Sequence, residues 1–212
     1  IISRGINVNV TLIFDLDRYQ QVMDAYIRGL QKLAQTDPAK VQDVASVASF
    51  FISRVDSEID KRLDGVGSDD ALRLRGKAAI AQAKVAYQMF ETTFSSEAWR
   101  SLIKLGAQVQ IPLWASTSTK NPAYPDTMYV DELIGAHSVN TLPDATMDAF
   151  SDHGSIAETI TNNVEAARAV LHALEGAGID MTAIADQLEA EGVVSFQQSF
   201  NDLLAVLEAK SK

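Results

Sequence analysis

The sequence predicts an α/β fold built on a parallel β-sheet, and two observations carry this prediction. First, four short apolar segments rich in β-branched residues alternate with segments whose apolar residues recur at helical spacing. Strands that alternate with helices usually pair in parallel through crossover connections. Second, polar residues gather late in each expected strand or just after it, where parallel α/β folds place their ligand sites.

The first half of the alternation contains two expected strands. A β-branched segment at 6–14 ends at Asp15, which we expect to cap a helix whose apolar stripe runs over 19–33. A second apolar segment at 44–53 is followed by a long helical stripe over 72–90. The small residues of that stripe should let the helix lie close against the sheet.

The second half contains a clear third strand, a weaker fourth strand and a helical end. The third segment, 107–116, alternates at first and then becomes continuously apolar, while the fourth covers only 138–142. The rest of the chain predicts helices at 156–174, 181–190 and 196–209. The 212 residues are enough for one compact domain with a large core.

Composition argues against several classes of function. The net charge of −10 disfavours a nucleic acid or an anionic membrane as partner, because both require a basic face. The absence of cysteine excludes disulfides, thiolate catalysis and zinc–sulfur sites, and it fits a reducing cytoplasm. No apolar run approaches the roughly 20 residues of a membrane span. The chain starts without an initiator methionine or a signal-peptide layout, so we expect it to begin inside a longer protein.

Four long segments carry more specific information: "GINVNVTLIF", "VASVASFFISRVDSEIDKRL", "GKAAIAQAKVAY" and "PLWASTSTKNPAYPDTMYVDELIG". In this order they resemble the transaldolase family in its longer bacterial form, most strongly from Gly5 to Pro143. The resemblance implies a (β/α)8 TIM barrel of the class I aldolase type. Residues 1–212 would be the C-terminal half of that single barrel domain and would supply strands five to eight and the final helices. The N-terminal half is then the missing partner, and the oligomeric state stays open.

The resemblance also implies a reaction of the pentose phosphate pathway. A dihydroxyacetone unit would pass from sedoheptulose 7-phosphate to glyceraldehyde 3-phosphate, giving erythrose 4-phosphate and fructose 6-phosphate. The carrier is a lysine Schiff base, and no cofactor or metal is needed. The substrates of the protein would therefore be small sugar phosphates.

Seven residues match family positions with implied roles. Asn9 would hydrogen-bond the hydroxyls of the dihydroxyacetone unit, and Thr11, on the same face of the strand, would position a proton-carrying water. Ser49 would contact the hydroxyl end of the substrate, and Phe51 would form a wall of the pocket. The other three would hold the sugar phosphate: Arg54, Ser116 and Lys120.

The two cations of this implied phosphate site have an alternative interpretation. Arg54 follows the second strand and Lys120 follows the third, so a parallel sheet makes them lateral neighbours that suit a dianion. Alternatively, each cation pairs with a nearby carboxylate. Arg54 would then pair with Asp56 or Glu58, and Lys120 with Asp126.

The chain offers no suitable nucleophile. A Schiff-base lysine must be desolvated to attack as the free amine, and the Asn-Pro loop around Lys120 is too open for this. We expect Lys61, Lys77 and Lys84 to be solvated on helices. The family's nucleophile and general acid lie on earlier strands, so the isolated chain is expected to be inactive.

Other motifs give little support to different chemistry. The acidic clusters "DSEID" and "GSDD" are interpreted as solvated faces or helix caps. His137, His153 and His172 lack ligand spacing, so we predict no metal site. Two alternatives to a transaldolase remain: a fructose 6-phosphate aldolase-like lyase, and a catalytically silent sugar-phosphate-binding fragment or part of a bifunctional enzyme.

Overall fold

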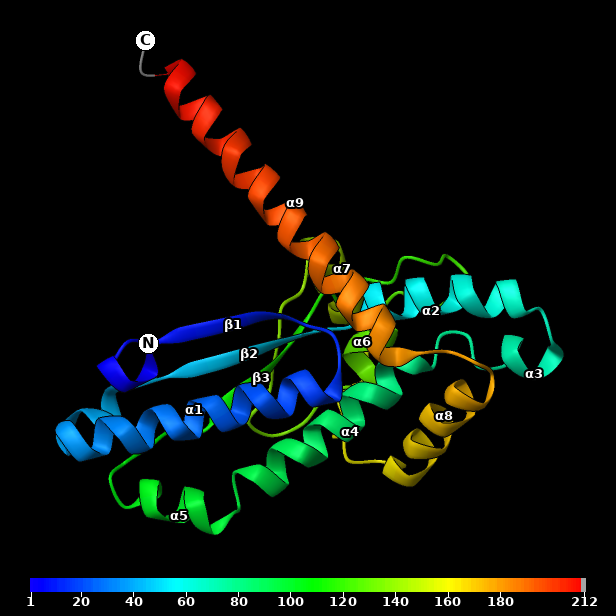
Figure 1. The fold of residues 1–212 in the computed structure, drawn as a ribbon. Helices are drawn as coiled ribbons and strands as arrows, with labels where there is room; N and C mark the ends of the chain where they lie inside the picture. The colour runs from blue at the N-terminus through cyan, green and yellow to red at the C-terminus, as the bar shows by residue number, and fades with distance from the viewer. Residues whose placement is uncertain (211–212) are drawn as a thin grey trace.

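The computed structural model of the chain describes residues 1–210 and contains a four-stranded parallel sheet in the order β1-β2-β3-β4 (Figure 1). The strands are β1 (Val8–Ile13), β2 (Ser46–Phe51), β3 (Gln110–Ala115) and the short β4 (Val139–Asn140). All three neighbouring pairs are parallel. The predicted sheet of adjacent parallel strands is therefore confirmed, and the architecture is mixed α/β.

Helices connect and cover the strands. They are α1 (Leu16–Thr36), α2 (Ser53–Val66), α3 (Asp69–Leu72), α4 (Ala78–Thr93), α5 (Glu97–Ile103), α6 (Met128–Asp131), α7 (Asp144–His153), α8 (Val164–Gly176) and α9 (Met181–Lys210), with short 3-10 turns at Ile2–Arg4 and Pro38–Asp43. The expected cap of α1 is present, since Asp15 Oδ1 accepts a hydrogen bond from the Arg18 amide at 2.6 Å. None of the helices in the described part of the chain is long and apolar enough to cross a membrane.

The two faces of the sheet have different surroundings. Helices α1, α4 and α5 lie along one face (Figure 1), where the Phe50 ring meets Tyr19 and Trp114 edge-on. The opposite face, which we call the open face, carries the alternate residues of each strand. There Val47, Ile111 and Leu113 are only half-buried. The open face is thus the side of the sheet that the described helices leave largely uncovered.

Three expected helix boundaries are wrong. The stripe over 72–90 is split into α3 and α4 by a turn in which Gly76 has φ +69°, a left-handed conformation that ends helices. Residues 156–163 form a connection before α8, because the Ile160 amide bonds the Ile134 carbonyl at 3.1 Å instead of continuing a helix. The helices expected at 181–190 and 196–209 are one continuous helix, α9.

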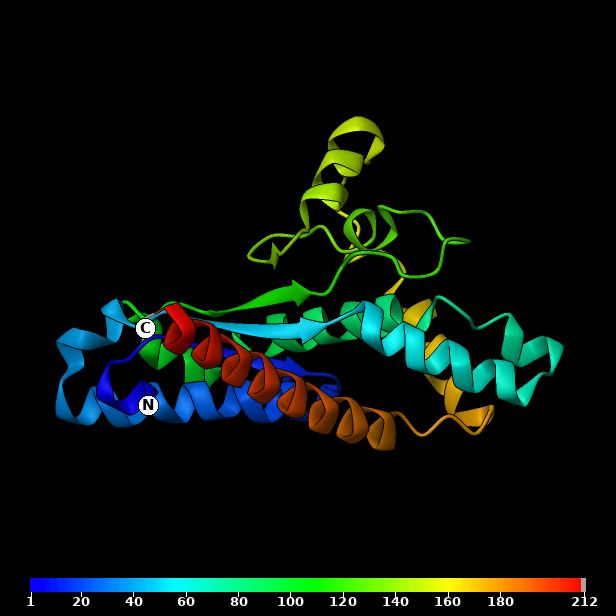
Figure 2. The same cartoon turned by 90° about the horizontal axis from the view of Figure 1, so that it is seen from above.

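Helix α9 has two environments. Its first half packs against α2 and β1, and a Cβ built on Gly192 would lie 2.7 Å from the Leu12 side chain. Beyond Gly192 the helix rises obliquely above the open face and away from the rest of the molecule (Figures 1 and 2). This second half exposes a set of large apolar side chains: Val193, Val194, Phe196, Phe200, Leu203, Leu204, Val206 and Leu207.

Candidate functional site

Polar side chains meet on the open face where β1 and β2 lie side by side. The Ser49 hydroxyl donates a hydrogen bond to Asn9 Oδ1 at 2.7 Å. Asn9 pairs in register with Val47, which lies two residues before Ser49 on the same face of β2. Ser49 is buried while Asn9 is exposed, so the amide group of Asn9 is held in place and remains accessible.

A backbone irregularity follows Asn9 in β1. The pairing moves from Val10–Ala48 to Ile13–Phe50, so β1 contains one extra residue there. Leu12 within it has φ +59°, a conformation that a branched residue rarely adopts. Such bulges re-aim neighbouring side chains and are frequent beside active sites. Thr11 immediately precedes this bend and is exposed.

Phe51 and Arg54 form a stacked pair at the end of β2. The guanidinium carbon of Arg54 lies 5.1 Å from the centre of the Phe51 ring. The Phe14 ring packs on Phe51, with the two ring centres 5.0 Å apart. Arg54 forms no ion pair with any described carboxylate. Glu58, one of the two alternative partners, bonds Arg62 at 3.0 Å instead. The expected alternative of local pairing is therefore wrong for Arg54.

Ser116 is tied to the helix that carries Arg54. Its carbonyl accepts the Ser53 amide at 2.9 Å, and the two hydroxyl oxygens lie 2.9 Å apart. Ser116 has φ +59°, so the chain turns sharply as β3 ends. The next residue, Thr117, donates its hydroxyl to Oδ1 of Asn140 on the neighbouring strand β4 at 2.6 Å. Hydrogen bonds thus connect the ends of β2, β3 and β4.

Lys120 is placed differently from Arg54. Its ammonium is exposed and donates to the Ser118 hydroxyl at 2.5 Å within the same loop. Asp126, its alternative partner, lies 2.9 Å from His153 Nε2, so the pairing with Lys120 is wrong. This bond lowers the pKa of Asp126 and raises the pKa of His153. Among residues 1–210 no contact joins Lys120 to Arg54 directly.

The interpretation of "DSEID" as a solvated face is wrong for its two aspartates. Asp56 and Asp60 are only 1% and 8% exposed. Tyr129 donates its hydroxyl to Asp56 at 2.8 Å, and Tyr124 donates its hydroxyl to Asp60 at 2.6 Å. Burial raises the pKa of Asp56 to about 6. The sequence could have indicated this burial, because the spacing of Asp56 and Asp60 places them on the same helix face as apolar Ile59 and Leu63.

In "GSDD" the cap interpretation holds. The Ser68 hydroxyl accepts the Ala71 amide at 3.2 Å at the start of α3. Asp69 and Asp70 of this cluster are exposed.

The expectation of a solvated Lys84 is also wrong. The side chain is 8% exposed, and Nζ lies 2.8 Å from Glu132 Oε2. Lys84 also lines a small hollow between α4 and α8, in the layer of helices. An ion-paired ammonium on a covering helix is not the free amine that Schiff-base formation requires. Lys61 and Lys77 are exposed, as expected.

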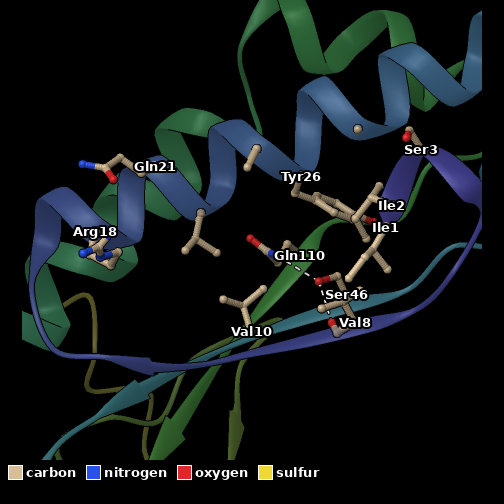
Figure 3. Close-up of a pocket in the computed structure, with 13 residues that line it drawn as sticks. Ile1, Ile2, Ser3, Val8, Val10, Arg18, Gln21, Tyr26, Ser46 and Gln110 are labelled. Atoms are coloured by element: carbon tan, nitrogen blue, oxygen red, sulfur yellow. Dashed lines mark hydrogen bonds between the residues drawn. The ribbon is translucent and has the colours of Figure 1, made fainter. Parts of the chain in front are cut away.

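A further hollow of about 430 Å³ lies between β1 and α1 (Figure 3). Apolar side chains including Ile2, Val8 and Val10 line it, and its central polar contact is the bond from Gln110 to Ser46 at 2.9 Å. Its lining contains no lysine, histidine or carboxylate. It lies on the helix-covered side of the sheet and has no group suited to the chemistry expected at the strand ends.

Helices cover one face of this parallel sheet, and polar groups, a bulge and a cation without an ion pair among the described residues lie toward the ends of its strands. Parallel α/β proteins place their ligand sites at these ends. Comparison with known proteins agrees: the family model described as Transaldolase/Fructose-6-phosphate aldolase matches residues 1–207. The chain therefore belongs to this family.

Named transaldolases are similar to nearly the whole chain. The transaldolase of Parafrankia sp. (strain EAN1pec) is 54% identical over 204 residues, which are 96% of this chain and 55% of that protein. Transaldolase 2 of Streptomyces avermitilis is 51% identical over 211 residues, 99% of this chain and 56% of that protein. The transaldolase of Mycobacterium bovis (strain BCG / Pasteur 1173P2) is 51% identical over 206 residues, 96% and 55% respectively. The chain thus spans little more than half the length of these relatives.

Proposed function

We propose that this chain is the C-terminal half of a transaldolase barrel and forms the substrate-binding side of its active site. The complete enzyme transfers a dihydroxyacetone unit between sugar phosphates through a lysine Schiff base, as a cytoplasmic step of the pentose phosphate pathway. The observation that carries the proposal is the hydrogen-bonded pair of Asn9 and Ser49 on the sheet. Arg54, which has no carboxylate partner among the described residues, lies at the start of the helix that follows β2.

The hydroxyl end of the donor would be read by β1 and β2. Asn9 offers an amide whose oxygen is already fixed by Ser49 at 2.7 Å, so its NH₂ group is oriented for a substrate hydroxyl. Thr11 lies two residues further along the chain, where β1 bends, and is exposed. Its hydroxyl would hold the water that moves protons during carbon–carbon bond cleavage. Preorganised donors and acceptors of this kind need no rearrangement when charge develops.

The phosphate of the substrate would be held at the ends of β2 and β3. Arg54 stacks on Phe51 with no carboxylate partner among the described residues, so its planar donors remain available for phosphate oxygens. Ser116 adds a hydroxyl next to the residue that precedes Arg54. Lys120 would complete the site as a second cation. A dianion would relieve the mutual repulsion of the two cations.

The same proposal assigns residues 1–212 to strands five to eight of the barrel, with the other half supplying the nucleophile. Within residues 1–210 no strand pairs with the outer edge of β1 or of β4. An exposed strand edge is a liability that native proteins cover. The apolar hollow beside β1 (Figure 3) and the uncovered sheet face support the same assignment, because a further strand and helix would bury them.

One alternative reaction is kept because the family's description also includes fructose-6-phosphate aldolase. Such a lyase would cleave the ketose phosphate by the same Schiff base and would not need an acceptor. Stimulation of donor consumption by an aldose phosphate acceptor supports the transferase. Equal consumption with and without acceptor supports the lyase.

The proposal is tested by completing the barrel. We would express this chain alone and fused behind the part of the Parafrankia transaldolase that it does not cover, and treat both with fructose 6-phosphate and borohydride. We expect turnover and a covalent adduct only in the fusion, with the adduct on the added part. An adduct on Lys84 or Lys120 would show that the nucleophile lies in this chain. Binding of sugar phosphate by a fusion that forms no adduct would support a silent binding fragment.

A further inference from the structure

Lys120 depends on a loop for its position. The segment from Ser116 to Asp131, which we call the Lys120 segment, leaves the sheet after β3 and contains no strand. Its internal contacts include the bond from the Thr119 hydroxyl to the Pro125 carbonyl at 2.9 Å. Among the described residues, Lys120 bonds only Ser118 of the same segment. The position of its ammonium relative to the rest of the sheet is therefore set by how the whole segment docks.

Two tyrosines dock the Lys120 segment on α2. Tyr124 donates its hydroxyl to Asp60 Oδ2 at 2.6 Å, and Tyr129 donates its hydroxyl to Asp56 Oδ2 at 2.8 Å. The two aspartates are one helical turn apart, so they present their carboxylates on the same face of α2. Arg54 lies at the start of this helix. One element therefore carries both the first cation and the two acceptors that hold the segment of the second cation.

Each aspartate is itself fixed from the other side. Asp56 Oδ1 accepts the Ala79 amide at 2.8 Å, and Asp60 Oδ1 accepts the Gly76 amide at 2.9 Å. Both carboxylates thus bridge the start of α4 to the Lys120 segment. Tyr124 also packs directly on Gly76, where a Cβ would lie 2.8 Å from its ring. The docking geometry leaves little freedom to the tyrosine rings.

The docking contacts border the same hollow as Lys120. A cavity of about 350 Å³ is lined by Lys120 together with both aspartates and both tyrosines. Oδ2 of each carboxylate accepts a hydrogen bond from a tyrosine hydroxyl. In the described part of the chain no ion pair joins either carboxylate to Lys120. The ammonium therefore remains available for a ligand.

We propose that Asp56 and Asp60 are positioning residues for the binding of the substrate phosphate. Through their bonds to Tyr129 and Tyr124 they fix the distance between Lys120 and Arg54. This inference rests on the proposed phosphate site. The four side chains do not touch the substrate. They determine where the Lys120 segment sits relative to α2, and hence the spacing of the two cations.

The test uses the complete enzyme and removes one hydroxyl at a time. Tyr124→Phe and Tyr129→Phe retain the ring packing and remove only the bonds to the carboxylates. We expect each to raise KM for fructose 6-phosphate by roughly three- to tenfold, with kcat nearly unchanged. KM for unphosphorylated fructose should stay within about twofold. Tyr26→Phe is the matched control, because it removes a tyrosine bond of 2.8 Å to the Gln108 carbonyl before β3. It should change neither KM.

A double-mutant cycle separates positioning from general stability. In a Lys120→Ala background, Tyr124→Phe should have no further effect on KM for the phosphorylated donor, because no ammonium remains to be positioned. Additive effects of the two changes would overturn the positioning role and leave the phosphate site intact. Unchanged KM in Lys120→Ala alone would overturn both the positioning role and the assignment of Lys120 to the phosphate site.

Discussion

The Arg54 guanidinium lies over the Phe51 ring, with its central carbon 5.1 Å from the ring centre, where β2 passes into α2. A cation over an aromatic face is held electrostatically without losing its outward-pointing donors. Arg54 is therefore oriented by a group that does not compete for its hydrogen bonds. Its N–H groups can therefore donate to an anionic ligand.

Replacing Arg54 by alanine in the complete enzyme should raise KM for sugar phosphates about ten- to a hundredfold, since a charge-assisted hydrogen bond contributes roughly 1.5–3 kcal/mol. Unphosphorylated dihydroxyacetone and fructose should be affected much less. Steady-state kinetics with both kinds of donor make the measurement. Arg62→Ala is the control, because Arg62 lies on the same helix as Arg54 but bonds Glu58 of that helix and Gln187 of α9. An equal increase in KM for both kinds of donor would mean that Arg54 stabilises the fold and does not bind the phosphate.

Ser49→Ala should lower kcat/KM by roughly tenfold for phosphorylated and unphosphorylated donors alike, because the dihydroxyacetone end is common to both. The change removes the bond that orients Asn9. Ser46→Ala is a matched control on the opposite face of β2, where the hydroxyl donates to the Val8 carbonyl at 2.7 Å. It should reduce thermal stability and leave kcat/KM unchanged. A loss of activity restricted to the phosphorylated donor would argue against the assigned role of Ser49.

Stability should depend on pH through Asp56. Its pKa is raised from 3.8 to about 6, mainly by burial, so between these values the folded protein holds a proton that the unfolded chain has released. The contribution of this group is therefore favourable below about pH 4, and stability falls by roughly 2–3 kcal/mol as pH rises to about 6. Denaturant unfolding of the complete protein and of Asp56→Asn at several pH values makes the comparison. The difference between the two curves should shrink toward low pH.

Asp126→Asn provides a control of opposite sign for that experiment. The bond from His153 lowers the pKa of Asp126, so the stability that Asp126 adds is lost as pH falls. A pH-independent difference between wild type and Asp56→Asn would contradict the raised pKa of Asp56.

Two glycine substitutions should have opposite effects on stability. Gly65 in α2 has open space around its missing side chain, so Gly65→Ala should stabilise the protein by about 0.5–1 kcal/mol through helix propensity. Gly192 in α9 faces Leu12, whose side-chain atoms would lie 2.7 Å and 3.1 Å from the added Cβ. Leu12 is buried in the bend of β1 and would have to shift to admit this Cβ. Gly192→Ala should therefore destabilise the protein by about 1 kcal/mol.

Thermal unfolding of the two glycine variants in parallel makes that comparison. Equal stabilisation by both would show that Leu12 yields easily and that α9 does not pack tightly on the bend of β1.

The sequence by itself determined the parallel sheet, the order of its strands and the cap at Asp15. These features depend on local patterns: β-branched segments, helical spacing and a carboxylate one residue before a helix. The family resemblance also selected Asn9 and Ser49, which the fold brings to 2.7 Å. Their roles in catalysis stay predictions until the kinetic experiments are made.

Only the tertiary structure decided which charged residues are buried. Asp56 lies in a charged stretch of sequence and Lys84 is a lone cation in an alanine-rich helix. Both are contacted by residues that follow β3, Asp56 by Tyr129 and Lys84 by Glu132. The same holds for Gly192, which interrupts the sequence pattern but lies inside one continuous helix. Leu12 occupies the space that a side chain at this position would need. Burial is a property of what packs on a face, and that partner is distant in sequence, so periodicity alone does not reveal it.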